Sequence, residues 1–457
     1  MGDPEGGVSC APAGAGQGDA PAVQQGGDAA AAEASALRKV GTRLLPYLAL
    51  LYFAAFIDRV NVGFAALQMH RDLGFSDRVY GLGAGIFFVG YCLFEVPSNL
   101  ILHRVGGRRW LARIMISWSL IAGAMVFVRG EHGFYALRCL LGVAEAGFFP
   151  GVIYYLTYWV PARERARLVG RFIVAVPVST ALGGPISSAI LRLDGVHGLA
   201  GWQWLFVLET VPSLALGILT WRYLPDAPGD ARWLSPRERE VLTRKLDAER
   251  AGAALLHGGN ALRAVLGSRV LALALCYFGV ELGMYGVIFW VPQIFAHAGV
   301  APEHIGYAVA APYALAAAAM IAWSRRSDRR MERAGHIAAA SVVGCLGLVA
   351  SACWADCPAW ALVAISIGAA GTFSVLPIFW TLPAASFRGA SAAGAIALIN
   401  AIGNLGGFAG PFVIGWIKGS TGSFTGGLLA AAAGVLATGV MAWLIERGTD
   451  KPRAGAA

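Results

Sequence analysis

Charged residues are scarce in this sequence. Asp, Glu, Lys and Arg supply only 14% of the 457 residues, whereas hydrophobic residues supply 57%, and the mean hydropathy is +0.60. So few charges cannot cover the surface of a soluble protein, and one soluble core could not bury so much apolar mass. The composition therefore excludes an ordinary soluble domain and indicates a polytopic membrane protein.

Cysteine and histidine are also sparse, with seven and eight residues in the chain. Cys353 and Cys357 are spaced as C-x3-C, but no histidine or further cysteine stands beside them, so the spacing does not fit a zinc site. No G-x-x-x-x-G-K-[ST] run precedes a helix, so an ATP-driven pump is unsupported. No nucleophile and base are placed as an enzyme would need them. We therefore expect no required disulfide, no metal, no cofactor and no enzymatic activity.

Apolar segments recur along the chain, each long enough to cross about 30 Å of hydrocarbon at about 20 residues per crossing. A polar stretch separates them into two groups of six. Within this stretch, Ser235 as helix cap, Pro236 after it and Glu238 three residues after the cap predict the start of a helix. The expected spans are 44–69, 80–102, 111–130, 133–158, 168–191, 202–224, 270–293, 303–323, 336–354, 359–383, 391–417 and 425–445.

The predicted fold is all-α, with twelve transmembrane helices in two pseudo-symmetric six-helix bundles. Residues 1–36 are rich in Gly, Ala, Gln and Pro and lack the pattern of a signal peptide, which predicts a disordered cytoplasmic tail. The N-terminal bundle should cover 37–224 and the C-terminal bundle 269–446. We expect a central cytoplasmic loop at 225–268 and a second tail at 447–457.

Arginines gather in three loops, and these loops account for much of the net charge of +9. All three fall on one side of the predicted membrane, so both termini should be cytoplasmic. Orientation in the bilayer explains the basic excess, and we expect no nucleic-acid partner. Basic loops at equivalent places in both halves also indicate an internal duplication. The clusters are Arg104, Arg108, Arg109 and Arg113; Arg163, Arg165, Arg167 and Arg171; and Arg325, Arg326, Arg329, Arg330 and Arg333.

Two charges interrupt an apolar, glycine-rich run at 138–151, RCLLGVAEAGFFPG. Arg138 and Glu145 are seven residues apart, so on a helix they share one face, roughly 10 Å apart along the axis. A charge inside a membrane helix is costly and normally faces a wet path or a protein interior. An arginine also suits a carboxylate, because its planar fork donates two parallel hydrogen bonds. Arg138 is our first candidate for binding an anion, and a structural ion pair is the alternative.

Asp58 and Arg59 interrupt the first span in the same way. Burial raises the pKa of a carboxyl group and a nearby arginine lowers it, so Asp58 and Glu145 are candidates for carrying a proton. If a substrate occupied Arg138, the carboxylate would lose its compensating cation and would be protonated more easily. Binding of the substrate and binding of the proton would then be coupled. Adjacent residues point about 100° apart on a helix, so Asp58 and Arg59 cannot face the same partner. The alternative is that both only fix helix packing.

Four stretches carry a resemblance to a known family: FIDRVNVGFA at 56–65, EVPSNLILHRVGGRRW at 95–110, RCLLGVAEAGFFPG at 138–151 and the glycine-rich run at 397–427. The chain resembles the major facilitator superfamily and, within it, the anion:cation symporters that carry organic anions. The resemblance runs from about Leu44 to the last span. It implies a carboxylate substrate such as tartrate, phthalate or a sugar acid.

The resemblance also implies roles for individual residues. In this family, the arginine that matches Arg138 is implicated in anion binding and coupling. In related sugar-acid symporters, the carboxylates that match Asp58 and Glu145 are the proposed protonation sites, with Arg59 as a partner. The superfamily signature between the second and third spans, G-x-x-x-D-R-x-G-R-R, has His103 here in place of its aspartate.

The loop residues of that signature are candidates for gating. In the first half the basic part is kept, and in the second half an acid and an arginine are kept. A gate that depends on the missing aspartate is in doubt. These residues are Arg104, Arg108 and Arg109, and Asp328 and Arg329.

Further polar and aromatic residues could complete a substrate pocket, although ordinary packing explains each of them about as well. Asn400 and Asn404 are four residues apart and share a helix face, where they could bind hydroxyls or a second carboxylate. Glu95, Glu209 and Glu281 are also intramembrane charges, but we rank them lower. The remaining candidates are Tyr91, Tyr285, Trp290 and Ser374.

The sequence therefore predicts a secondary active transporter that moves a small organic anion together with a proton. We expect a monomer surrounded by lipid, and the resemblance implies a bacterial inner membrane. The alternatives with the same fold are a sodium-coupled carrier and an anion exchanger. Those of another class are a membrane-embedded enzyme and a receptor that senses solute without moving it.

Overall fold

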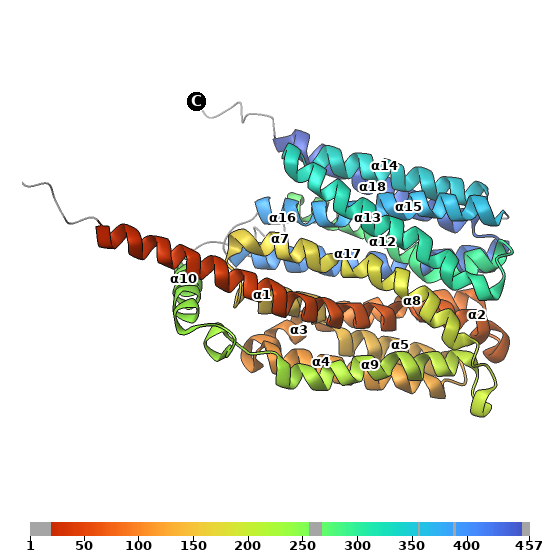
Figure 1. The fold of residues 1–457 in the computed structure, drawn as a ribbon. Helices are drawn as coiled ribbons and strands as arrows, with labels where there is room; N and C mark the ends of the chain where they lie inside the picture. The colour runs from red at the N-terminus through yellow and green to blue at the C-terminus, as the bar shows by residue number, and fades with distance from the viewer. Residues whose placement is uncertain (1–19, 256–266, 355–356, 387–389, 450–457) are drawn as a thin grey trace, which may run out of the picture.

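The computed structural model describes residues 20–255, 267–354, 357–386 and 390–449, and all secondary-structure elements in these ranges are helical. Twelve helical segments are long and apolar enough to cross a membrane. The prediction of twelve spans is confirmed. In Figure 1 the first six and the last six lie as two adjacent bundles with roughly parallel axes.

The N-terminal bundle contains nine α-helices, because three of its spans are interrupted. The first span is divided into α1 and α2, the fourth into α5 and α6, and the fifth into α7 and α8. The bounds are α1 (Ala20–Val60), α2 (Val62–Leu73), α3 (Asp77–Val105), α4 (Gly107–Ala124), η1 (Met125–Phe127), α5 (Glu131–Glu145), α6 (Phe148–Thr157), α7 (Ala162–Ile173), α8 (Ala175–Leu191), η2 (Val196–Gly198) and α9 (Gly201–Tyr223).

The connecting segment and the C-terminal bundle follow. Helix α10 lies across one end of the molecule, and both ends of the described chain lie at this end as well (Figure 1). We call it the α10 end, and the opposite end, which carries η2, the η2 end. The bounds are η3 (Pro228–Asp230), α10 (Pro236–Leu255), α12 (Ser268–His297), α13 (Pro302–Arg330), α14 (Ala334–Cys353), α15 (Pro358–Phe379), α16 (Thr381–Ser386), α17 (Ala390–Thr421) and α18 (Thr425–Thr449).

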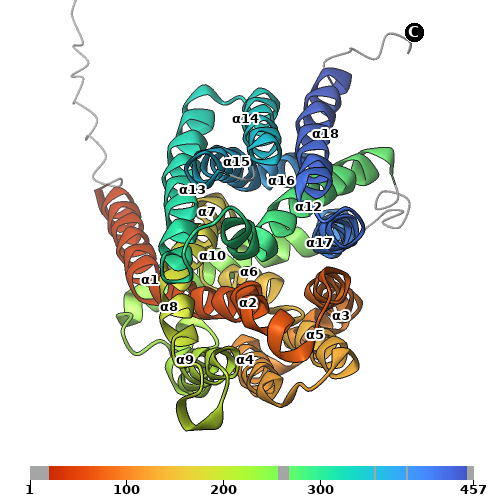
Figure 2. The ribbon, with the colours of Figure 1, turned by 90° about the vertical axis from the view of Figure 1, so that its right-hand side faces the viewer.

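Three helix pairs join the bundles: α3 with α17, α8 with α13, and α2 with α12. Figure 2 looks onto the η2 end and shows the first two pairs side by side. Glycines allow the backbones to approach closely. A Cβ on Gly81 would lie 2.7 Å from the carbonyl oxygen of Pro411, and a Cβ on Gly184 would lie 2.7 Å from that of Gly306. These contacts lie in the half of the molecule nearer the η2 end, and they hold the bundles together there.

Helix α1 begins at Ala20, inside the segment for which we expected disorder. The physical reason is that alanine-rich sequence favours helix and that α10 provides partners for it. Ser35 Oγ donates to Glu238 Oε1 and Lys39 Nζ to Glu238 Oε2, both at 2.7 Å.

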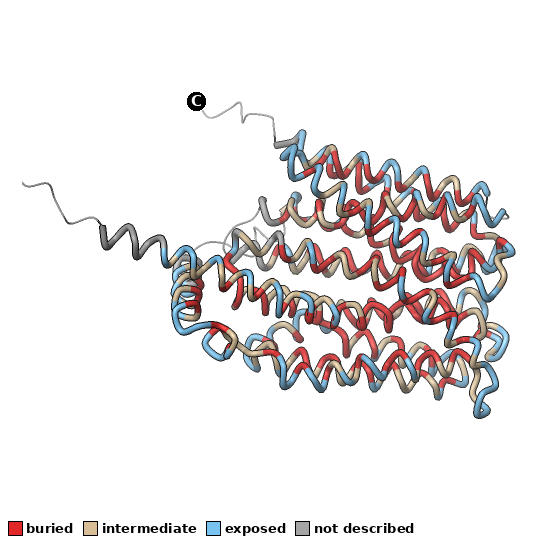
Figure 3. Tube along the Cα trace, viewed as in Figure 1, coloured by how far each residue is buried: buried red, intermediate tan, exposed pale blue. Residues whose placement is uncertain are grey.

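The predicted start of α10 is confirmed, because the backbone N–H of Ser235 donates to Glu238 and that of Glu238 donates to Ser235 Oγ. Buried residues concentrate along the bundle helices, and exposed residues concentrate at their ends and in the connecting segments (Figure 3).

The candidate gating residues all lie at the α10 end, in the last turns of α3 and α13 and the first turn of α4. Arg104, Arg109 and Arg329 are exposed. Arg108 forms an ion pair of 3.1 Å with Asp226, which follows α9. A carboxylate outside the signature therefore pairs with one of the arginines of the signature.

The second-half gating acid is also paired. Asp328 accepts a hydrogen bond of 2.6 Å from Arg333. Both residues belong to the predicted basic loop between α13 and α14, so this pair lies within the C-terminal bundle rather than between the bundles.

Candidate functional site

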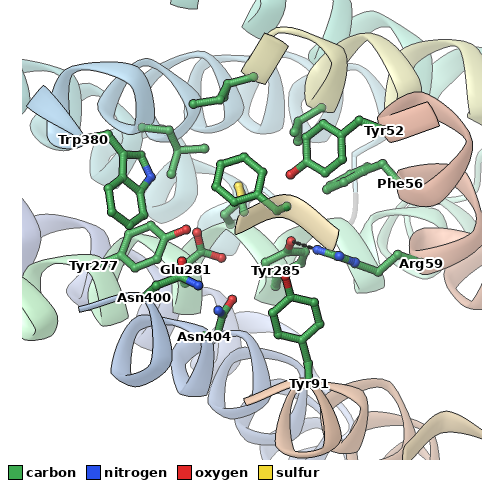
Figure 4. A pocket seen from close by; sticks show the side chains of 15 residues that line it. Tyr52, Phe56, Arg59, Tyr91, Tyr277, Glu281, Tyr285, Trp380, Asn400 and Asn404 are labelled. Atoms are coloured by element: carbon green, nitrogen blue, oxygen red, sulfur yellow. Dashed lines mark hydrogen bonds between the residues drawn. The ribbon is translucent and has the colours of Figure 1, made fainter. Parts of the chain in front are cut away.

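A polar pocket lies between the two bundles (Figure 4). It encloses about 500 Å³, including its mouth. Helices α1, α3, α6 and α7 with α8 contribute from one bundle, and α12, α15 and α17 from the other. The lining residues are Tyr52, Phe56, Arg59, Tyr91, Phe149, Ile173, Val176, Tyr277, Glu281, Met284, Tyr285, Leu376, Trp380, Asn400 and Asn404.

Two helix interruptions bring the charged motifs to this place. Helix α1 ends at Val60, directly after Arg59, and α5 ends at Glu145. Gly147 then adopts a left-handed conformation with φ of +82°, which a residue with a side chain enters only at a cost. Interrupted helices near the middle of a span are typical of binding sites in transporters. The sequence thus breaks the helices next to the side chains that meet at the pocket.

Arg59 is the centre of a buried network. Its Nη2 forms an ion pair with Glu145, and its Nη1 donates to the Tyr285 hydroxyl at 2.8 Å. The guanidinium also lies over the rings of Phe87 and Tyr91, at 5.1 and 5.5 Å from their centroids. Tyr285 comes from α12, so this network joins the two bundles. A charge held in this way is positioned by bonds on both sides of the pocket.

Asp58 faces away from Arg59, into the N-terminal bundle. Its Oδ2 accepts hydrogen bonds from Trp118 Nε1 at 3.0 Å and from Ser213 Oγ at 2.5 Å. It does not line the pocket. The angular argument from the sequence is confirmed, since the two adjacent side chains have different partners.

Arg138 is also placed outside the pocket, which differs from our expectation for an anion-binding residue. Its side chain is buried, and it donates to the backbone carbonyls of Gly83 at 3.1 Å and Ala84 at 3.2 Å. Within the described part of the chain its Nη1 has no hydrogen-bond partner. The physical reason for the difference is that carbonyls of α3 hold the guanidinium, and the sequence does not show which carbonyls lie within reach.

Asn400 and Asn404 line the pocket and bind a third acid. The Nδ2 atoms of both donate to the carboxylate of Glu95, with Asn404 at the longer distance of 3.5 Å. Tyr91 and Tyr285 also line the pocket, as expected. Trp290 does not, because its Nε1 donates to Pro411 O at 3.1 Å within the C-terminal bundle.

Ser374 does not line the pocket either. Its Oγ donates to Ala370 O on its own helix at 2.6 Å. A serine that bonds to its own helix in this way has satisfied its donor locally. Both Ser374 and Trp290 are therefore used by packing in this structure.

Sequence reasoning gave too little weight to Glu281 and did not find Tyr52, Tyr277 and Trp380, which all line the pocket. A signal was present. Glu281 lies four residues before Tyr285, and Tyr277 four residues before Glu281, so the three share one face of α12. Once Tyr285 was a candidate, the helical spacing alone pointed to the other two.

Comparison with known proteins agrees with the fold. A "Putative tartrate transporter" of Agrobacterium vitis is 48% identical over 423 residues, which cover 92% of this chain and 93% of that protein. A "Quinolone resistance transporter" of Acinetobacter baumannii is 43% identical and covers 87% of this chain and 91% of its own length. Among solved structures, the inward-open xylose transporter XylE from Escherichia coli superposes with a TM-score of 0.71 at 14% identity, over 90% and 97% of the two chains.

These relatives are transporters, and the structural likeness at this identity concerns the fold. A sequence model of the family matches residues 48–411, from the first span to the eleventh. The chain therefore belongs to the Major Facilitator Superfamily of membrane transport proteins.

Proposed function

We propose that this multi-pass membrane transporter is a proton-coupled symporter of an organic anion. The observation that carries the proposal is the position of Arg59, which lines the pocket while it is ion-paired to the buried Glu145. One guanidinium can thus face either a substrate carboxylate or the carboxylate of Glu145. Competition for one cation is a direct way to couple a proton to an anion.

The coupling follows from the cost of an unpaired charge. Removing one partner from a buried ion pair leaves a charge without compensation, at about 3–5 kcal/mol. If a substrate carboxylate takes Arg59, the Glu145 carboxylate loses its cation and gains a proton, which restores neutrality. If the proton leaves Glu145, the ion pair reforms and the substrate is displaced. Tyr285 holds the other side of the guanidinium at 2.8 Å during this exchange.

Asp58 is the second proposed proton site. It lies within the N-terminal bundle, where Trp118 and Ser213 donate to its Oδ2 and, within the described part of the chain, its Oδ1 has no partner. A protonated Asp58 could donate from that free oxygen, and an ionised one depends on its two donors. Arg138 is proposed to support the pocket by fixing the backbone of α3 at Gly83 and Ala84.

The names of the relatives support a carboxylate substrate, because two proteins at 48% identity are named for tartrate. The bidentate fork of Arg59 fits such a group. We further propose an inner-membrane location, with the α10 end in the cytoplasm because the arginine clusters lie there. The fold needs no second copy to complete the pocket, and a monomer is proposed.

The test is tartrate uptake into proteoliposomes under an imposed pH gradient. Glu145→Gln should abolish accumulation and preserve exchange of labelled for unlabelled tartrate, because a neutral amide imitates the protonated acid permanently. Glu209→Gln is the matched control, since Glu209 is a buried acid bonded to Ser187 outside the pocket. If uptake survives collapse of the proton gradient and follows sodium or internal anion instead, the carrier is sodium-coupled or an exchanger.

A further inference from the structure

The charges around the pocket do not balance. Arg59 and Glu281 are the charged side chains in its described lining, and they come from opposite bundles (Figure 4). Arg59 already has an acid, Glu145. Glu281 has only 2% of its surface exposed, and no described basic side chain forms an ion pair with it. The pocket therefore holds one buried acid more than its bases can match.

The surroundings of Glu281 are aromatic. In Figure 4 Glu281 lies between Tyr277 and Tyr285, and Trp380 lies beyond Tyr277. The rings of Tyr277 and Trp380 pack edge to face with centroids 5.0 Å apart. Tyr52 lines the same pocket from α1. A carboxylate among several aromatic rings is the environment that binds a protonated nitrogen, since the ring faces and the acid all attract positive charge.

The neighbouring amides add acceptors on the same side. Asn400 and Asn404 each use one Nδ2 hydrogen to donate to Glu95, so each amide keeps its carbonyl oxygen as an acceptor and a second N–H hydrogen as a donor. The Glu281 carboxylate and the two amide oxygens are acceptors, and the hydroxyls of Tyr52 and Tyr277 and the indole N–H of Trp380 are neighbouring donors. A cationic donor can bind the acceptors and also balance the charge of Glu281.

We propose that the C-terminal side of the pocket is a subsite for a protonated nitrogen, formed by Glu281, Tyr277 and the amide oxygens of Asn400 and Asn404. The substrate is then a carboxylate that also carries an amino group: its carboxylate binds Arg59 and its ammonium binds Glu281. This inference rests on the proposed function in taking the pocket between the bundles as the substrate site. It names a class of substrate that a lone arginine site would not select.

The selection has a physical basis. A plain hydroxyl in place of the ammonium could donate one hydrogen bond but would leave Glu281 without a cation. A ligand with no donor would leave the acceptors unpaired as well, and sites built for a polar group reject analogues that lack it far more strongly than apolar sites do. The expected order of affinity is therefore amino acid, hydroxy acid and then simple carboxylate.

The test compares two ligands that differ in one group, D-gluconate and 2-amino-2-deoxy-D-gluconate. Binding of each to the purified full-length protein in nanodiscs is measured by calorimetry at pH 7, where the amino group is protonated. The wild type should bind the amino compound about tenfold more tightly, as expected for a hydrogen bond to a charged group. Glu281→Gln should reduce this preference to less than about twofold.

Two further variants make the result decisive. Glu281→Asp keeps the charge and should keep most of the preference, which also covers the case in which the glutamine variant does not fold. Glu209→Gln removes a buried acid outside the pocket and should leave the preference unchanged. Equal binding of both ligands by the wild type, binding of neither, or an unchanged preference in Glu281→Gln overturns the inference.

The measurement uses no gradient, so it is separable from the proposed coupling. A preference that depends on Glu281 in a protein whose uptake ignores protons would leave the subsite in place and remove the symport proposal. Loss of the preference together with intact proton-driven uptake of tartrate would remove the subsite and leave the symport proposal in place.

Discussion

The two bundles share an architecture but differ in the charges that they bury. In the described part of the C-terminal bundle, the buried residues of the types Asp, Glu, Lys, Arg and His are Glu281 and His336. Among the residues whose burial is described, the N-terminal bundle buries six charged side chains. On the function proposed above, the two similar bundles divide the work: the N-terminal bundle exchanges charge, and the C-terminal bundle offers mainly amides and aromatic rings to the substrate. The six are Asp58, Arg59, Glu95, Arg138, Glu145 and Glu209.

The largest effect is expected for Arg59→Gln. The change leaves Glu145 without its cation and removes the fork that would hold a carboxylate, so substrate affinity should fall about 100-fold and stability by about 3 kcal/mol. Calorimetric binding and thermal unfolding in detergent measure the two. If affinity stays within about threefold of the wild type, the pocket does not bind its anion through the N-terminal bundle. The proposed division of roles between the two bundles is then wrong.

The next prediction separates the acids of the two bundles. Asp58→Asn should abolish accumulation of tartrate driven by a pH gradient while exchange across the membrane continues. Glu281→Gln should keep gradient-driven accumulation, because Glu281 is assigned to recognition. Both are measured in the same proteoliposomes. Accumulation that is lost in Glu281→Gln and intact in Asp58→Asn would reverse the proposed division.

Arg138→Lys should have a smaller effect. A lysine lacks the planar fork that now binds two carbonyls at once, so stability should fall by about 1 kcal/mol and substrate affinity should weaken through the displaced α3. Unfolding curves and calorimetry with tartrate report each quantity. Near-normal affinity together with reduced stability would take Arg138 out of the site and leave it a structural role.

A prediction within the C-terminal bundle concerns the two asparagines. Asn400→Ala should weaken binding of a hydroxylated acid several-fold and Asn404→Ala less, because Asn404 lies farther from Glu95, at 3.5 Å. Calorimetry on both variants with D-gluconate gives the order. The opposite order would mean that the amide nearer the middle of α17 makes the main substrate contact.

The smallest effect concerns the α10 end. Burial opposes ionisation of Glu238, but donors from Lys39, Ser235 and Ser35 hold its pKa at about 2, below the ordinary 4.5. Because the pKa is depressed in the folded state, the contact between α1 and α10 should be complete above pH 4.5 and weaken as the pH falls toward 2.

Spin labels at Thr42 and Arg244 would measure the distance between the two helices as a function of pH. Both positions are exposed, and the hydrogen bonds of their side chains go to residues other than Glu238. In Glu238→Gln the distance should not change over this pH range. A shift that persists in that variant would assign the titration to another group.

Much of the fold was predictable because it depends on the length and hydropathy of segments, which the sequence displays directly. The helix start at Ser235 and the divergence of Asp58 and Arg59 were predictable for a similar reason, since both follow from local geometry. The helix from Ala20 onward was not predictable, because it depends on contacts with Glu238, about 200 residues away.

The site was only partly predictable. Tyr285 and the two asparagines at 400 and 404 line the pocket as expected. The position of Arg138 could not be deduced, because its acceptors are backbone carbonyls that any sequence would supply. Glu281 was undervalued although its spacing of four residues from Tyr285 places both on one face of α12, and the sequence does not show which helix that face meets. The pairing of helices across the two bundles decides that, and it is a property of the tertiary structure.

Asp58 and Arg59 are consecutive residues, so one peptide unit is the whole covalent separation between a carboxylate enclosed in the bundle and a guanidinium open to the pocket. Turning α1 about its own axis by the roughly 100° between neighbours would bring Asp58 to the direction that Arg59 now has, and would place an acid where the anion is proposed to bind. Rocking the bundles as rigid bodies preserves both directions. On the proposed function, the rotational setting of α1 separates the proton site from the substrate site, and the conformational cycle has to keep this setting.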